Sequence, residues 1–114
     1  MLIYLAGASY NRLLIKGVEE WLKTKNSNFE FTSNWYKEDF RDTEQYAQKD
    51  IEEVLSSDVV VAFYPYGELG GTLSEMSISY AKKIDVIYVR HPYWDEEDPF
   101  ISQFFEPYNK HKIQ

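Results

Sequence analysis

Cysteine is absent from this chain, which excludes a disulfide framework and a metal site built on thiolates. The two histidines, His91 and His111, have no partners at metal-ligand spacing, so we expect no bound metal. Hydrophobic runs are short, and none approaches the roughly 20 residues that a membrane-spanning helix needs. Basic residues are also few: 12 Lys and Arg stand against 19 Asp and Glu, a formal net charge of −7. Polymeric nucleic acid is therefore not an expected partner, because phosphate backbones bind basic surfaces.

Motifs for common cofactors and nucleophiles are missing as well. The Gly-x-Gly-x-x-Gly fingerprint of dinucleotide sites and the Walker pattern of phosphate-binding loops do not occur. No serine stands in a nucleophile elbow, and no Ser-His-Asp set is evident. The segment Met1–Ala6 has no basic leader and is too short for the apolar part of a signal peptide. We therefore expect no cofactor and a cytoplasmic location.

The residues that are present suit a single α/β domain covering 1–114. Short apolar segments predict strands, and stripes with helical spacing predict helices between them. The predicted strands are 2–6, 29–32, 59–63 and 85–89, and the predicted helices are 9–23, 43–55, 72–83 and a short one at 100–105. The residues expected to face the core are Leu13, Leu14, Val18, Trp21 and Leu22 of the first helix and Ile51, Val54 and Leu55 of the second.

Strands that alternate with helices predict a parallel sheet, because parallel neighbours need a crossover connection. Right-handed crossovers then favour a doubly wound arrangement. The expected fold is a Rossmann-like or flavodoxin-like sheet of about four to five strands in the order 2-1-3-4, with helices on both faces.

The most informative stretch is 70–75, Gly-Gly-Thr-Leu-Ser-Glu, which follows the apolar strand and opens a helix. Ligands of open parallel sheets bind at the carboxyl ends of the strands, and glycine lets backbone approach a ligand closely. Glu75 is therefore a candidate functional carboxylate. The alternative is a structural role, in which Glu75 only complements the positive end of its helix dipole.

Two further places carry candidate chemistry. The turn Gly7-Ala8-Ser9 opens the first helix and can present backbone N–H groups to an anion, with Arg12 in reach of a phosphate; the alternative is a capped helix with a solvated Arg12. Asp50 shares a helix face with Val54, and an inward carboxylate costs desolvation free energy unless it is paired or used. The alternative for Asp50 is a surface position balanced by a lysine or by solvent.

Four stretches together resemble the nucleoside 2-deoxyribosyltransferase family, whose superfamily also includes deoxynucleoside monophosphate N-glycosidases. They are Ile3–Ser9, Phe31–Trp35, Asp50–Ile51 with Ser57–Val60, and Gly70–Glu75, in matching order and spacing from about residue 2 to residue 89. The resemblance implies that Glu75 attacks C1′ of a 2-deoxyribosyl group, that Asp50 protonates the leaving base, and that Tyr4 orients Glu75. It also implies substrate-binding roles for Gly7, Ser9, Arg12, Trp35, Gly70, Gly71 and Thr72.

The chain departs from the family pattern at two positions. Leu69 stands where the family often has a polar or acidic residue for the 5′ group of the sugar, and Ser77 stands where the family usually has glycine. The expected function is cleavage or transfer of the N-glycosidic bond of a 2-deoxyribonucleoside or its 5′-monophosphate. The alternative, which Leu69 favours, is a module of the same fold that binds or sequesters nucleotides without turnover.

Aromatic residues are dense near the end of the chain, where a small domain cannot bury them all. They are Tyr93, Trp94, Phe100, Phe104, Phe105 and Tyr108. Because aromatics are enriched in interfaces, we expect a homo-oligomer, most simply a twofold dimer, with the loop 92–105 at or near the interface. The family's C-terminal segment often completes a neighbour's site, and the tail 108–112 could do so here. The alternatives are that the rings only cover the sheet edge, or that the protein is a scaffold that oligomerises through this tail.

Overall fold

The computed structural model describes residues 1–37, 43–63, 71–89 and 112–113, and the side chains of 43–46 and 112–113 are not described. Its strands and helices alternate along the chain as the sequence predicts. The strands are β1 (Leu2–Ala6), β2 (Glu30–Phe31), β3 (Val59–Phe63), β4 (Asp85–Val89) and β5 (Lys112–Ile113). The helices are α1 (Arg12–Lys25), α2 (Thr43–Leu55) and α3 (Gly71–Ala81), with short 3-10 turns η1 (Ser9–Asn11) and η2 (Trp35–Lys37).

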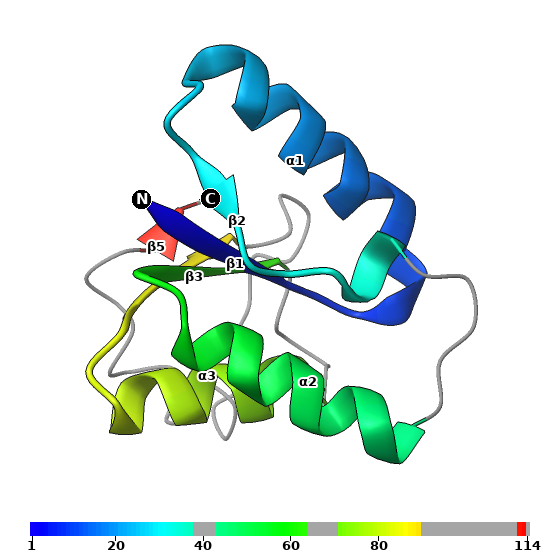
Figure 1. Cartoon of the computed structure of the whole chain (residues 1–114), viewed down its shortest axis with the longest axis vertical. Helices are drawn as coiled ribbons and strands as arrows, with labels where there is room; N and C mark the ends of the chain where they lie inside the picture. The colour runs from blue at the N-terminus through cyan, green and yellow to red at the C-terminus, as the bar shows by residue number, and fades with distance from the viewer. Residues whose placement is uncertain (38–42, 64–70, 90–111, 114) are drawn as a thin grey trace.

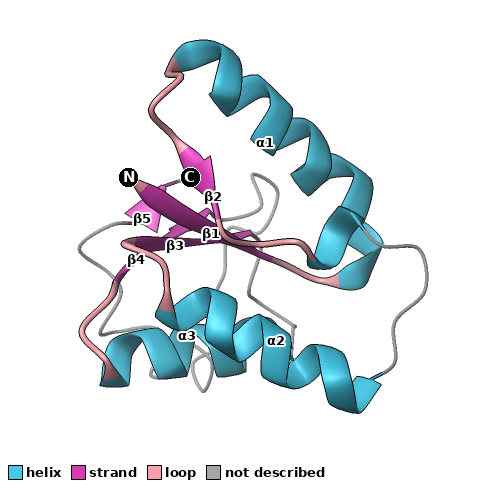
Figure 2. Ribbon diagram, viewed as in Figure 1, coloured by secondary structure: helices cyan, strands magenta, loops and turns pink. Residues whose placement is uncertain are grey.

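All five strands are parallel and lie in the order β2-β1-β3-β4-β5. The predicted order 2-1-3-4 is therefore confirmed, and β5 extends it by a two-residue strand that the sequence does not predict. Figure 1 shows the sheet between two helical layers: α1 covers one face, and α2 and α3 lie together on the other. Figure 2 shows β1 and β3 between these layers, and η1 and α1 follow directly after the carboxyl end of β1.

The core forms where β1, β3 and β4 meet these helices, because their β-branched and aromatic side chains are covered from both sides. Tyr4, Val60 and Tyr88 from the strands are fully buried, as are Ile15 from α1 and Met76 from α3. Continuous apolar runs of this kind are typical of parallel strands that are buried on both faces.

The face of α1 that meets the sheet agrees only in part with the one that the sequence predicts, since Val18 packs against the core as expected. Leu13, Leu14 and Trp21 were expected to face the core but are exposed, and Ile15 is buried in their place. Helical spacing alone cannot decide between two apolar stripes on opposite sides of one helix, and packing selects the stripe that contains Ile15.

A smaller error of the same kind occurs in α2. Val54 is buried as predicted, whereas Ile51 and Leu55, also predicted to face inward, are largely exposed. Consecutive helical residues differ by about 100° in direction, so Val54 and Leu55 cannot both face the sheet.

A buried chain of hydrogen bonds ties the segment after β2 to β1 and α1. The Ser33 hydroxyl accepts from the Leu5 amide at 3.1 Å, and Ser33 and Tyr36 hydroxyls are 2.9 Å apart. Tyr36 donates to Glu19 on α1 at 2.5 Å, and the Trp35 indole N–H donates to the Leu5 carbonyl at 2.7 Å. The end of β1 is thus held in place from one side.

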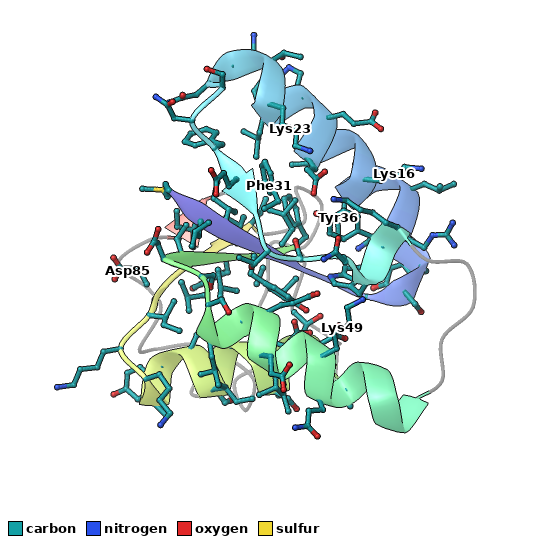
Figure 3. The ribbon with its side chains drawn as sticks, in the orientation of Figure 1. Lys16, Lys23, Phe31, Tyr36, Lys49 and Asp85 are labelled. Atoms are coloured by element: carbon teal, nitrogen blue, oxygen red, sulfur yellow. The ribbon has the colours of Figure 1, made fainter. Side chains whose placement is uncertain are left out.

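Charged groups complete this network beneath α1. The Glu19 carboxylate lies 3.0 Å from the ammonium groups of both Lys23 and Lys37. Figure 3 shows Lys23, Phe31 and Tyr36 gathered between α1 and β2, and the Lys23 ammonium lies 5.7 Å from the centre of the Phe31 ring. Burial alone would raise the pKa of Glu19, but hydrogen bonds from Tyr36, Lys37 and Lys23 outweigh it and lower that pKa below its ordinary value.

Candidate functional site

Tyr4 lies at the centre of the candidate site. It is on β1, is fully buried, and points toward the side of the sheet that carries α2 and α3. Burial raises the pKa of Tyr4 far above its ordinary value, and the negative charge and hydrogen-bonding reach of Glu75 raise it further, followed by the charges of Asp50 and Glu53. The Tyr4 hydroxyl therefore keeps its proton and is available as a donor.

Among the carboxylates, Glu75 has the largest effect on the pKa of Tyr4. It lies in the second turn of α3, is half-buried, and sits close enough to contribute a hydrogen bond to Tyr4, although the pair falls short of full hydrogen-bond geometry. Glu75 therefore lies close to the buried Tyr4 rather than in bulk solvent.

The position of Glu75 depends on Gly71, one helical turn earlier. A Cβ built on Gly71 would lie 3.4 Å from Oε1 of Glu75, so the carboxylate folds back along α3 toward its N-terminus. Helical side chains lean in that direction, and the positive end of the helix dipole favours a carboxylate there. Thr72 follows with its side chain buried and its hydroxyl without a hydrogen-bond partner among the described residues.

Asp50 approaches from α2, where it is half-buried one turn before the fully buried Val54. It lies on the same side of the sheet as Glu75, because α2 and α3 cover the same face, and its negative charge adds to the raised pKa of Tyr4. The structure therefore brings together Tyr4, Asp50 and Glu75 from three separate elements, while the functional roles of these residues remain predictions.

Glu53 is a residue near the site that the sequence reasoning missed. Its carboxylate accepts from the Asn34 amide at 3.2 Å and from the Asn34 side-chain Nδ2 at 3.1 Å. This pair joins α2, one turn beyond Asp50, to the segment that follows β2. Spacing of three residues from Asp50 on a helix is the only signal in the sequence that could have indicated it.

The turn after β1 is shaped by one close contact. A Cβ on Gly7 would lie 2.3 Å from Cδ1 of the buried Ile15, so only glycine fits here without movement. Ser9 beyond it is exposed, Arg12 is half-buried, and the Asn11 side-chain Nδ2 is buried without a hydrogen-bond partner in the described part of the chain. The turn thus offers polar groups at the strand ends.

Trp35 lies in the core rather than at an open surface. Its indole N–H is already bonded to the Leu5 carbonyl, and its ring packs edge-on against Tyr36 with the centroids 5.3 Å apart. These contacts give Trp35 a structural role, and its substrate contact stays a prediction. The predicted binding residue Gly70, the departure at Leu69 and the aromatic loop 92–105 lie outside the described residues, as do both histidines.

Two searches of the described residues bear on other classes of site. They contain no cluster of three or more His, Asp or Glu side chains placed to hold a metal ion. Within the same residues, no helix combines the length and the apolar character that crossing a membrane requires.

Comparisons with known proteins found a similar solved structure. No protein-family model and no curated protein matches the sequence. The CMP N-glycosidase BcmB of Clostridium botulinum is similar in structure, with a TM-score of 0.68 and 21% sequence identity over 99% of this chain and 87% of that chain. The likeness confirms the predicted α/β fold.

Proposed function

We propose that this protein cleaves or transfers the N-glycosidic bond of a 2-deoxyribonucleoside or its 5′-monophosphate, with Glu75 as the nucleophile. The observation that carries the proposal is the convergence of Tyr4, Glu75 and Asp50 at one end of a parallel sheet, where such folds bind ligands. Glycosidic bonds are usually cleaved by a pair of carboxyl groups, one of which attacks the sugar while the other protonates the leaving group. The fold shared with an enzyme named as a CMP N-glycosidase adds support.

The first step divides the work between the two carboxylates. An oxygen of the Glu75 carboxylate attacks C1′ and forms a glycosyl ester as the bond from C1′ to the base nitrogen breaks. The electron pair of that bond stays on the base, which takes a proton from the Asp50 carboxylic acid. Tyr4 keeps its proton because its pKa is raised, and its O–H donates to Glu75 and orients the attacking oxygen.

The second step releases the sugar. Water attacks C1′ of the ester and gives the free sugar, or a second base attacks and gives a new nucleoside. In both cases the Glu75 carboxylate is restored, and Asp50 takes up a proton from the attacking group. Burial of Tyr4 and the half-burial of Glu75 and Asp50 limit water around the reacting atoms, which strengthens these electrostatic effects.

The turn after β1 and the start of α3 are the proposed binding surfaces. Gly7, Ser9 and Arg12 would bind the 5′ group of the sugar, and a monophosphate would suit the backbone N–H groups and the Arg12 guanidinium. Gly70, Gly71 and Thr72 would line the sugar beside Glu75, and Trp35 would support the base side of the site from the core. The unbonded Thr72 hydroxyl supports this assignment because a buried hydroxyl usually finds a partner.

The test is an assay of free base released from a panel of deoxynucleosides, their 5′-monophosphates and CMP, with and without an acceptor base. We expect release from at least one member by the natural protein and none by Glu75→Ala, while Glu75→Ala still binds that substrate. The matched control is Glu52→Ala, which removes an exposed carboxylate of α2 and should turn over normally.

Two outcomes would overturn the proposal. Normal turnover by Glu75→Ala would exclude the covalent step. Tight binding of a nucleotide by the natural protein with no base released from any substrate would favour the binding module instead.

A further inference from the structure

The outer face of α1 carries large apolar side chains that the fold does not use. Tyr10 is 73% exposed, Leu13 75%, Leu14 46% and Trp21 58%. Tyr10 lies in the turn η1 just before α1, while Leu13, Leu14, Gly17 and Trp21 have the spacing of a single stripe along α1. We call these five residues the outer stripe.

The outer stripe is not needed to attach α1 to the sheet. Ile15 is fully buried on the opposite side of the helix, and Val18 packs against the same core. In Figure 1 no described element lies over the outer side of α1. Helices on the surface of a monomer normally carry polar residues outward, and a contiguous apolar patch marks an interaction site.

We propose that the outer stripe is the contact surface for a second copy of this chain, with two α1 helices crossing antiparallel at Gly17. The stripe is self-complementary about that residue. Leu13 and Leu14 lie one turn before Gly17 and Trp21 lies one turn after it, so an antiparallel crossing sets Trp21 of each copy against the two leucines of the other. A twofold interface requires this kind of matching of a surface with itself.

Gly17 has the environment that a close crossing needs. A Cβ built on it would meet no atom of the described residues within 4 Å, so neither their packing nor the backbone geometry calls for glycine there. Glycine in a helix interior lowers stability relative to alanine. A neighbouring backbone passing over this position would account for it, because interhelical distances of about 8–10 Å leave little room for side chains at the crossing.

The charges beside the stripe fit the same arrangement. Lys16 and Glu20 are both exposed and lie on one flank of the outer stripe. In an antiparallel twofold crossing the two flanks lie on the same side of the contact, so each Lys16 comes within reach of Glu20 of the other copy, whereas a parallel twofold crossing would place the two flanks on opposite sides. Opposite charges at the rim select orientation more than they add affinity.

The dimensions of α1 indicate a weak dimer. A 14-residue helix is about 21 Å long and about 10–12 Å wide. The area that one face of α1 can bury is therefore smaller than the roughly 800 Å² per partner of a standard interface. The contact proposed here is distinct from the predicted interface at the loop 92–105, which lies outside the described residues.

The experiment is sedimentation velocity of the whole chain over a series from micromolar to near-millimolar concentration. We expect the natural protein to associate with rising concentration and Gly17→Gln to raise the dissociation constant by about tenfold or more. The same variant should be at least as resistant to denaturation as the natural protein at low concentration, because the helix gains a better helix former. A structural role for Gly17 would instead lower that resistance.

Matched substitutions locate the surface. Leu14→Lys should also weaken association, whereas Leu55→Lys should not: both leucines are 46% exposed, but Leu55 lies on α2 across the sheet. A natural protein that stays monomeric throughout the series would overturn the proposal and leave the stripe to a different partner. Association that survives Gly17→Gln and Leu14→Lys unchanged would overturn it as well, by placing the interface elsewhere.

Discussion

Gly71 and Glu75 face each other across one turn of α3, and a Cβ built on Gly71 would lie 3.4 Å from Oε1 of Glu75. The distance is at the border of ordinary van der Waals contact. Alanine therefore fits with little movement, whereas a branched side chain would occupy the place of the carboxylate oxygen. The glycine that begins this helix thus sets the direction of the proposed nucleophile.

We expect Gly71→Val to lower kcat/KM by about a hundredfold, since a displacement of about 1 Å at a reacting group has that effect. Gly71→Ala should have a much smaller effect. Gly17→Val is the control, because it makes the same change at a helical glycine with no atom within 4 Å. Base release that is equal in Gly71→Val and Gly17→Val would contradict the positioning role.

Replacing the proposed acid gives a second prediction. Asp50→Asn should slow base release by about 10²–10⁴-fold, the usual span for a general acid. The base of a 7-methylpurine nucleoside already carries a positive charge and leaves without protonation. With this substrate Asp50→Asn should slow base release much less. Glu52→Gln changes an exposed carboxylate of the same helix and serves as the control. Equal losses on both substrates would exclude Asp50 as the acid.

The turn after β1 gives a prediction about stability. Gly7→Ala should lower the free energy of unfolding by about 1–3 kcal/mol, because its Cβ would overlap Cδ1 of Ile15 at 2.3 Å. Ile15→Val removes that methyl group and alone should cost about 0.5–1.5 kcal/mol. The double variant should lose less free energy of unfolding than the two single variants lose together, as measured by denaturant unfolding. Strict additivity would mean that Ile15 is not what restricts position 7.

The network around Glu19 predicts a dependence of stability on pH. The pKa of Glu19 is lower in the folded protein than its ordinary value of 4.5, so its contribution is present above that value and is lost as the pH falls through the folded pKa. Glu19→Gln should cost about 1–3 kcal/mol at neutral pH and flatten the acid side of the profile. Denaturant unfolding between neutral and acid pH checks this. An unchanged acid slope in Glu19→Gln would show that other carboxylates cause it.

The sequence predicts the strands β1, β3 and β4 and the helix α2 with the bounds that the structure shows, because each is an uninterrupted apolar run or a clearly periodic segment. It does not predict which stripe of α1 meets the sheet, since both Ile15 and Leu14 lie on apolar faces and only packing decides between them. The two-residue strand β5 is too short to leave a periodic signal.

The candidate site was predicted unevenly for physical reasons as well. Glycines before a helix and a carboxylate within it indicate Glu75 directly, and the resemblance to a family adds Asp50 and Tyr4. Contacts between distant segments leave no local pattern, so the Glu53 and Asn34 pair could not be predicted. The same holds for Trp35, whose indole N–H donates a hydrogen bond to the Leu5 carbonyl of β1.

The bonds that Leu5 makes have a consequence for how the molecule behaves in a crowded solution. β2 pairs with β1 only as far as Ile3, so the next outward-facing N–H and C=O, those of Leu5, would otherwise lie on an open edge. The Ser33 hydroxyl and the Trp35 indole occupy both groups. Side chains thus substitute for the missing length of a strand and close the edge to pairing with foreign chains, which is the usual starting point of amyloid-like growth.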